Sequence, residues 1–150
     1  MRENGETMND FDPLASIQRF YDAENEFVRA EPSERDISVM LNELDPNVVV
    51  HVPDSLSHGG TWRGHAGFEK LFEVVTEHWQ EFEVVYNDTR WHRIDDRRVL
   101  TMGRLRAVLR ANGLHVDMPV VSLFTFTSQG LSYLDHFYKD TAAIVCPRSE

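Results

Sequence analysis

The chain has 150 residues, 41% of them hydrophobic, which suffices for one globular domain with a single core and excludes an intrinsically disordered protein. Its net charge of −10 argues against nucleic acid and membranes as partners, because phosphate backbones and anionic lipid surfaces repel an acidic protein. The single cysteine, Cys146, cannot form an intramolecular disulfide or a paired-cysteine metal site. The N-terminus is polar and no apolar run approaches about 20 residues, so we expect a cytoplasmic protein without a signal peptide or membrane span.

The first half of the chain predicts helices interrupted by short strands. Asp12 and Pro13 are typical of a helix start, because aspartate caps the first turn and proline fits the first helical position. Apolar residues then repeat on one helical face as far as Ala30. The elements expected after it are a helix from Ser33 to Leu44, a turn at 45–47, strands at 48–52 and 61–63, and a helix from Gly64 to Trp79.

The second half predicts long antiparallel strands. We expect them at 82–94, 97–111, 115–127 and 131–138. Asn112-Gly113 strongly indicates a hairpin between the second and third of these strands. Helices followed by such a run of strands predict an α+β protein, with the helices on one side of a curved sheet.

Local motifs in this order resemble the NTF2-like superfamily. They are VVVHVP at 48–53, GGTWRGHAGF at 59–68, MPVVSLFTF at 118–126 and LDHFYKD at 134–140. The resemblance is greatest to the SnoaL-like, ketosteroid-isomerase-like subgroup. It implies an α+β cone, in which a curved antiparallel or mixed sheet wraps around a cavity and three helices lie in the N-terminal half. The domain would cover 12–145, between a disordered tail at 1–11 and a C-terminal tail at 146–150.

Arginines on the strand at 97–111 alternate with apolar residues. Because alternate side chains of a strand point to opposite faces, we expect the apolar set to face the core and the arginines to face outward, toward solvent or a second subunit. The alternative is that the arginines form a clamp for an anion. They are Arg98, Arg104, Arg106 and Arg110.

Asp117 on the next strand is a candidate catalytic acid. It alternates in step with Pro119, Val121 and Leu123, a set that we expect to line the cavity. The resemblance aligns Pro119 with the oxyanion-binding acid of ketosteroid isomerase. It therefore implies that Asp117, two residues earlier, could polarise a substrate carbonyl in its protonated form. The alternative is a solvated Asp117 at the rim of the sheet.

His136 on the last strand is the second catalytic candidate. It shares a face with Leu134 and Tyr138, and the resemblance implies that this face lines the pocket. His136 aligns with the catalytic acid of limonene epoxide hydrolase and of polyketide cyclases. A histidine suits proton transfer because its ordinary pKa is about 6.5. The alternative is a buried neutral histidine with a backbone or tyrosine partner.

Two positions depart from ketosteroid isomerase. Its general base aligns with Val52 and its catalytic tyrosine with Phe20, and neither side chain can perform that chemistry. Asp54 could replace the base, although it follows Pro53 in a loop. Tyr21 could replace the tyrosine, although it lies about 100° further around the helix.

The sequence predicts a cofactor-independent isomerase, cyclase or lyase that uses acid–base chemistry on an apolar carbonyl compound, such as a polyketide or a steroid-like ring. His136 would move the proton. Asp117 would orient the His136 ring or, if protonated, form a hydrogen bond to the enolate. The residues expected to bind substrate are Tyr138, Trp62, Leu134, Tyr21 and Asp54. We expect no metal site, because the seven histidines form neither HxH nor HxxxH; His58 would lie near the pocket mouth.

The alternative function is a non-catalytic module that binds a ligand or another protein, which the replacements at Val52 and Phe20 favour. Under either hypothesis we expect a homodimer. It would form through the outer face of the sheet, where Phe137, Val120 and Phe124 need cover.

Overall fold

The computed structural model describes residues 11–85 and 89–145. The tails expected at 1–10 and 146–150, with Cys146, lie outside these residues. Phe11, which we expected in the N-terminal tail, packs against Phe126 with ring centroids 5.2 Å apart. Across the described residues, no helix combines the length and the apolarity needed to cross a bilayer.

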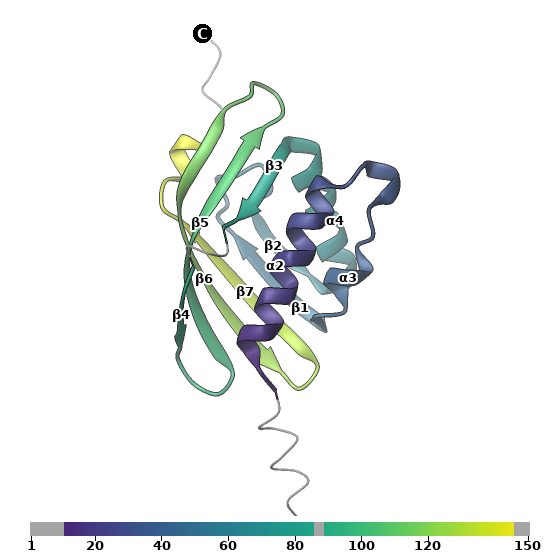
Figure 1. Ribbon diagram of the computed structural model, residues 1–150, viewed down its shortest axis with the longest axis vertical. Helices are drawn as coiled ribbons and strands as arrows, with labels where there is room; N and C mark the ends of the chain where they lie inside the picture. Colours follow the sequence, from purple (N-terminus) through teal and green to yellow (C-terminus); the bar gives the residue numbers. More distant parts are fainter. Residues whose placement is uncertain (1–10, 86–88, 146–150) are drawn as a thin grey trace, which may run out of the picture.

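Two long helices lie on one side of the sheet (Figure 1). Helix α2 (Pro13–Arg29) begins as predicted, because Asp12 Oδ1 accepts a hydrogen bond from the Leu14 amide at 3.0 Å. Helix α4 (Gly64–His78) also forms where its apolar stripe predicted it. The helix expected from Ser33 is shorter: a turn of 3₁₀ helix, η1 (Pro32–Glu34), precedes the single α-helical turn α3 (Ser38–Leu41).

The strands form one mixed sheet that curves around the helices (Figure 1). Across the sheet the order is β2-β1-β7-β6-β5-β3, and β4 pairs with β5. β1 runs parallel to β7, whereas the other pairs are antiparallel. This topology confirms the predicted α+β fold with a curved mixed sheet. The strands are β1 (Leu44–Val52), β2 (Gly60–Arg63), β3 (Trp79–Val84), β4 (Arg90–Arg93), β5 (Arg98–Leu109), β6 (His115–Thr127) and β7 (Gly130–Tyr138).

Some element boundaries differ from the prediction for local reasons. The turn expected at 45–47 lies inside β1, where the pairing with β7 shifts register between Leu44 and Val49. The strand expected at 82–94 is two strands, β3 and β4, which both pair with β5. Trp79, expected at the end of a helix, is the first residue of β3 and is fully buried.

The faces of β5 and β6 show which residues can reach the core. β5 follows the prediction, with Val99, Thr101 and Leu105 buried. On β6 the predicted assignment is wrong, because the even-numbered residues are the buried ones. The pairing of β5 with β6 places Leu105 opposite Met118, and paired residues point to the same face of a sheet. The buried residues of β6 are Val116, Met118, Val120, Ser122, Phe124 and Phe126.

The same register corrects the surface expected for dimerisation. Val120 is 6% exposed and Phe124 is fully buried, so both belong to the core and not to the outer face. Phe137 does lie on the outer face and is 54% exposed.

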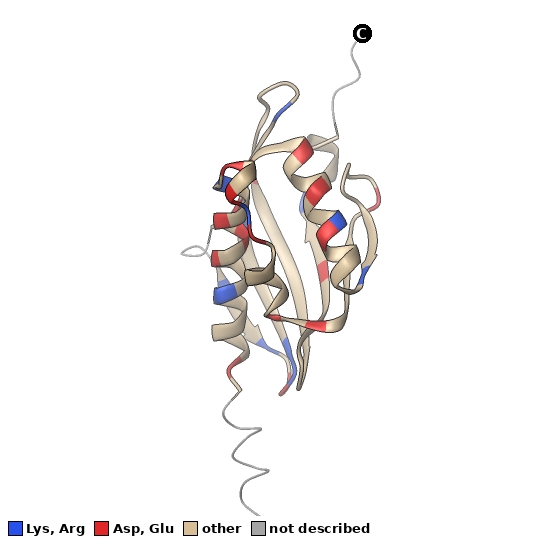
Figure 2. Ribbon diagram, turned by 90° about the vertical axis from the view of Figure 1, so that its right-hand side faces the viewer, with Lys and Arg blue, Asp and Glu red and all other residues tan. Residues whose placement is uncertain are grey.

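Charge is distributed unevenly over the molecule. Acidic side chains outnumber basic ones on both α2 and α4, as Figure 2 shows. Arg104 and Arg106 of β5 are exposed on the opposite, outer face of the sheet. Each of the two long helices therefore has a net negative formal charge.

Candidate functional site

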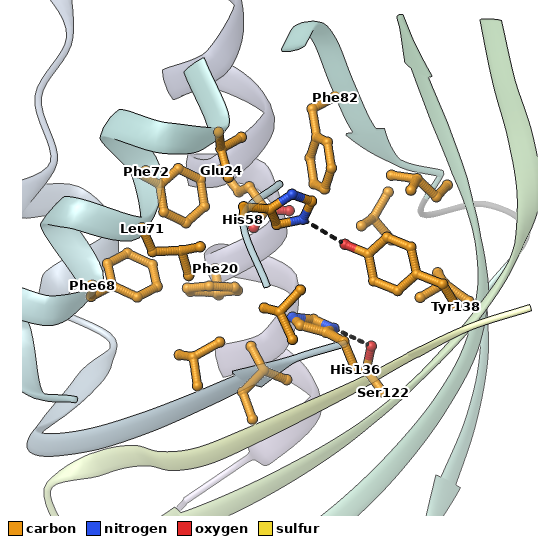
Figure 3. A pocket seen from close by; sticks show the side chains of 17 residues that line it. Phe20, Glu24, His58, Phe68, Leu71, Phe72, Phe82, Ser122, His136 and Tyr138 are labelled. Carbon is orange, nitrogen blue, oxygen red and sulfur yellow. Dashed lines mark hydrogen bonds between the residues drawn. The ribbon is translucent and has the colours of Figure 1, made fainter. Parts of the chain in front are cut away.

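A pocket lies between the long helices and the inner face of the sheet (Figure 3). Its walls are mostly apolar, with aromatic rings from Phe20, Phe68, Phe72 and Phe82. Small-molecule sites typically combine such walls with a few polar groups that orient the ligand. The polar residues that line it are Glu24, His58, Ser122, His136 and Tyr138.

The pocket is nearly filled by its own side chains. Its cavity volume is only about 30 Å³. That is room for on the order of two water molecules. A ligand with several rings therefore requires the lining side chains to move.

His136 lies on the pocket face of β7, as predicted. Its Nδ1 is 2.7 Å from Ser122 Oγ, and the two residues pair directly across β6 and β7. Among the described residues, none hydrogen-bonds His136 Nε2. Burial, with a smaller effect from His58, lowers the pKa of His136 to about 3. The imidazole is therefore neutral near pH 7.

A hydrogen-bond chain joins Trp79, His58 and Tyr138. Trp79 Nε1 donates to His58 Nδ1 at 3.5 Å, and His58 Nε2 is 3.3 Å from Tyr138 Oη (Figure 3). Burial, with a smaller contribution from His78, lowers the pKa of His58 to about 4, so this ring is also neutral near pH 7. An indole N–H can only donate, so His58 carries its hydrogen on Nε2 and donates it to Tyr138.

The hydrogen bond from His58 determines how the Tyr138 hydroxyl can interact with a ligand. Burial, with a smaller effect from Glu24, raises the pKa of Tyr138, so the group keeps its hydrogen. Its oxygen accepts from His58, and within the described part of the chain no acceptor takes the hydroxyl hydrogen. Tyr138 can therefore donate a hydrogen bond to a ligand.

Glu24 is a pocket residue that the sequence analysis missed. It lies one helical turn after Phe20 on the buried face of α2 and is 6% exposed. Burial raises the pKa of Glu24 to about 8, so the carboxyl group is protonated near pH 7. Helical periodicity could have identified it, because Ile17, Phe20, Glu24 and Val28 follow the spacing of the buried stripe.

Of the residues expected to bind substrate, Leu134 and Tyr138 line the pocket, whereas Tyr21, Trp62 and Asp54 do not. Tyr21 is buried behind the pocket wall, with its hydroxyl 3.4 Å from Thr101 Oγ1. Trp62 donates from Nε1 to the His58 carbonyl oxygen at 3.1 Å, so it supports the loop that carries His58. Asp54 is exposed in that loop.

The expectation that Asp117 faces the cavity is wrong. It lies on the outer face of β6, where Arg104 contacts one of its carboxylate oxygens and Arg106 Nε lies 3.6 Å from the other. The side chain of Asp117 is 49% exposed. Two of the outward-facing arginines therefore pair with Asp117, and the group that holds His136 is Ser122.

The arrangement suits proton transfer better than metal binding. Neutral imidazoles can accept a proton, and a protonated carboxyl group and a tyrosine can donate hydrogen bonds. Among residues 11–85 and 89–145, no three His, Cys, Asp or Glu side chains lie close enough together to hold a metal ion.

Comparison with known proteins supports the fold and the family. A family model described as a SnoaL-like domain matches residues 17–132. An NTF2-like protein of unknown function from Burkholderia pseudomallei has a similar structure, with a TM-score of 0.73 and 21% identity over 89% of this chain and 94% of that chain. No curated protein matches the sequence.

Two further solved structures have names that refer to chemistry. TerC, crystallised with polyporic acid, has a TM-score of 0.71 and 20% identity, covering 87% of this chain and 93% of its own. A protein from Xanthomonas campestris pv. campestris, provisionally named a polyketide cyclase, has a TM-score of 0.71 and 18% identity, covering 88% of this chain and 93% of that chain. At these identities the likeness establishes the NTF2-like fold.

Proposed function

This chain belongs to the SnoaL-like domain family, and on that basis we propose that its pocket binds an apolar carbonyl compound and moves a proton on it without a cofactor. The observation that carries this proposal is His136, a neutral imidazole on the wall of an apolar pocket. Its Nδ1 is held by Ser122, and none of the described residues hydrogen-bonds its Nε2.

In the proposed reaction His136 acts as the base. When Nδ1–H donates to Ser122 Oγ, Nε2 has no hydrogen and can accept a proton from the carbon next to the substrate carbonyl. The electrons of that C–H bond form a C=C bond, and the carbonyl electrons move to the oxygen. Returning the proton from His136 to another carbon gives an isomer. Attack of the enolate carbon on a second carbonyl of the same molecule gives a ring and an alkoxide, and His136 then returns its proton to the alkoxide oxygen.

The substrate class follows from the walls of the pocket. Phenylalanine rings from both long helices and from β3 favour a compound with flat apolar rings, such as a polyketide or a steroid-like molecule. The names of similar structures support this class, because TerC was crystallised with polyporic acid and other neighbours are provisionally named polyketide cyclases. Polyporic acid is therefore a first compound to test.

The experiment is hydrogen–deuterium exchange on the substrate, followed by mass spectrometry. A panel of aromatic and cyclic ketones is incubated with the protein in D₂O, and polyporic acid, which has no hydrogen on a carbon next to a carbonyl group, is tested for binding only. We expect the wild type to accelerate exchange next to the carbonyl of at least one compound, and His136→Gln to slow it by about 10²- to 10⁴-fold. His115→Gln, which changes an exposed histidine on β6, is the matched control. Equal exchange by wild type and His136→Gln would remove His136 from the mechanism.

A second candidate function is ligand binding without chemistry. It is favoured by Val52 and Phe20, which place apolar side chains in the pocket where ketosteroid isomerase has its base and its tyrosine. Tight binding of a panel compound with no exchange above the buffer rate would support this alternative.

We also propose that the protein forms a homodimer through the outer face of the sheet. Met102, Val121 and Phe137 form a row across three neighbouring strands on this face. Met102 and Phe137 are 44% and 54% exposed. An exposed apolar row of this kind is stabilised when a second subunit covers it.

A further inference from the structure

Glu24 is an acidic side chain buried in the pocket, where the described part of the chain gives its carboxyl group no partner. It is 6% exposed, and no described residue forms a hydrogen bond or an ion pair with its carboxyl group. A buried carboxyl group without a partner is destabilising, because it loses its hydration and gains nothing in exchange. Figure 3 shows Glu24 on the helix side of the pocket, across from the strand that carries His136 and Tyr138.

The groups around Glu24 supply no positive charge. The titratable side chains that share the pocket are His58 from the β1–β2 loop and His136 and Tyr138 from β7. Tyr21, on the same helix, is also close enough for its ionisation to be opposed by Glu24. All four are neutral near pH 7, since burial lowers the pKa of both histidines and raises the pKa of both tyrosines.

The remaining walls near Glu24 are apolar. α4 contributes phenylalanine, leucine and valine side chains to the pocket, and β3 contributes Phe82 and Val84. Without a neighbouring cation, the carboxyl group is more stable protonated than ionised. Its O–H hydrogen then points into a pocket where no described residue accepts it.

We propose that Glu24 is a further catalytic residue, whose carboxylic acid donates a hydrogen bond to the carbonyl oxygen of the substrate while His136 removes the neighbouring proton. The substrate would thus lie with its carbonyl oxygen toward α2 and its acidic carbon toward β7. This inference rests on the proposed function and adds the hydrogen-bond donor that Asp117 cannot supply.

The donor stabilises the charge that this proton transfer creates, while Glu24 keeps its own proton. As the C–H proton moves to His136 Nε2, negative charge develops on the carbonyl oxygen. A hydrogen bond from Glu24 stabilises that charge more than it stabilises the neutral ketone, and this difference accelerates the step. The imidazolium and the enolate form together inside the pocket, so no net charge is added to an apolar environment.

The test compares ligands of the same shape. The probes are acetophenone, an aromatic ketone, and α-methylstyrene, in which a CH₂ group replaces the carbonyl oxygen; binding of each is measured by calorimetry. At pH 6 we expect the wild type to prefer the ketone by roughly 3- to 10-fold, as one additional neutral hydrogen bond predicts. This preference should fall as the pH rises through about 8, where the carboxyl group of Glu24 ionises.

Two variants of Glu24 separate its hydrogen bond from its shape. Glu24→Gln keeps a donor and should retain the ketone preference on both sides of pH 8. Glu24→Leu removes this donor and should lower the ketone preference by roughly 3- to 10-fold, and any preference that remains would come from the Tyr138 hydroxyl. Glu26→Gln, on an exposed position of the same helix, is the matched control and should behave as the wild type.

Specific outcomes would overturn the inference. They are a wild type that binds the two probes equally or binds neither, and a ketone preference that is as large in Glu24→Leu as in the wild type. Tighter binding of 1-phenylethylamine than of acetophenone would also overturn it, since Glu24 would then act as a counter-ion. Because this binding does not require His136, a Glu24-dependent preference without deuterium exchange would keep the hydrogen bond from Glu24 to a bound carbonyl group but reject the proposed reaction, and with it the catalytic role of Glu24.

Discussion

Glu24 and Asp117 are two acidic residues on opposite sides of the same sheet. Asp117 lies on the outer face, half exposed, between the guanidinium groups of Arg104 and Arg106. Glu24 lies against the inner face, 6% exposed, and burial raises its pKa to about 8. The difference shows that solvent and neighbouring charges decide what an acid can do: the outer one can form ion pairs, whereas the inner one can donate a hydrogen bond.

Burial also shifts the pKa values of the basic side chains on the inner face of the sheet. Burial lowers the pKa of His58 to about 4 and that of His136 to about 3. The inner polar residues are therefore neutral near pH 7, although several are of ionisable types. Glu24, His58 and His136 should therefore each make the free energy of unfolding depend on pH.

The largest expected effect concerns Glu24 at alkaline pH. The pKa of this carboxyl group is about 8 in the folded protein and 4.5 as its ordinary value, so the unfolded chain releases the proton first as the pH rises. The stability associated with the buried acid is present below pH 4.5 and is lost as the pH rises toward 8, by about 1.4 kcal/mol per pH unit. Glu24→Gln should remove this loss and gain about 4 kcal/mol relative to the wild type between pH 5 and pH 8.

Urea unfolding at several pH values measures this effect. Glu26→Gln, on the exposed side of α2, provides the control and should follow the wild type in parallel. If the free energy of unfolding of Glu24→Gln changes with pH as that of the wild type does, the fold does not keep the Glu24 carboxyl group neutral.

A smaller effect of opposite sign is expected for His136 at acidic pH. Its pKa is about 3 in the folded protein and 6.5 as its ordinary value, so the unfolded chain binds the proton first as the pH falls. The contribution of the neutral His136 to the free energy of unfolding is complete above pH 6.5 and is lost as the pH falls toward 3. Between pH 6.5 and pH 4.5, His136→Gln should lose about 2 to 3 kcal/mol less than the wild type in the free energy of unfolding.

The exposed His115 again provides the control for this measurement. His115→Gln should lose stability with falling pH as the wild type does. A similar acid sensitivity in His136→Gln would mean that the buried state of this histidine does not contribute to acid unfolding.

These inner residues were only partly predictable from the sequence. The cap of α2 and the apolar stripes of both long helices are local, so both helices were identified close to their observed bounds. The inner face of β6 was wrong but could have been inferred: a turn at Asn112-Gly113 pairs odd residues of β5 with even residues of β6, as Leu105 and Met118 do. The apolar residues at the even positions of β6 indicate the same face.

The hydrogen-bond chain could not be inferred in this way. Trp79 and His58 are separated by 21 residues, and His58 and Tyr138 by 80. Strand alternation places Tyr138 on the pocket face, but it says nothing about a loop histidine. Their meeting depends on how α4 ends and β3 begins at Trp79, where the sequence predicted continued helix.

The outer face of the sheet can be tested through its effect on the association of two subunits. Phe137→Asp puts a charge in the apolar row with Met102 and Val121, and we expect it to weaken the proposed dimer at least tenfold, or by about 1.4 kcal/mol. Val39→Asp, at a 52% exposed position on α3, is the matched control and should leave association unchanged. Analytical ultracentrifugation measures both. A wild type that is monomeric at micromolar concentration would contradict the proposed interface.

The smallest expected effect is that of Asp117→Asn. Exposed ion pairs contribute little, because water already stabilises both charges and the long side chains lose mobility when they pair. We therefore expect the free energy of unfolding to fall by less than about 1 kcal/mol and deuterium exchange on a ketone to change by less than about twofold. Arg104→Gln should behave similarly, and the double variant should show whether the two side chains are coupled. A large loss of exchange activity in Asp117→Asn would show that the outer face influences the pocket through β6. It would contradict the conclusion that Asp117 and Glu24 act independently of each other.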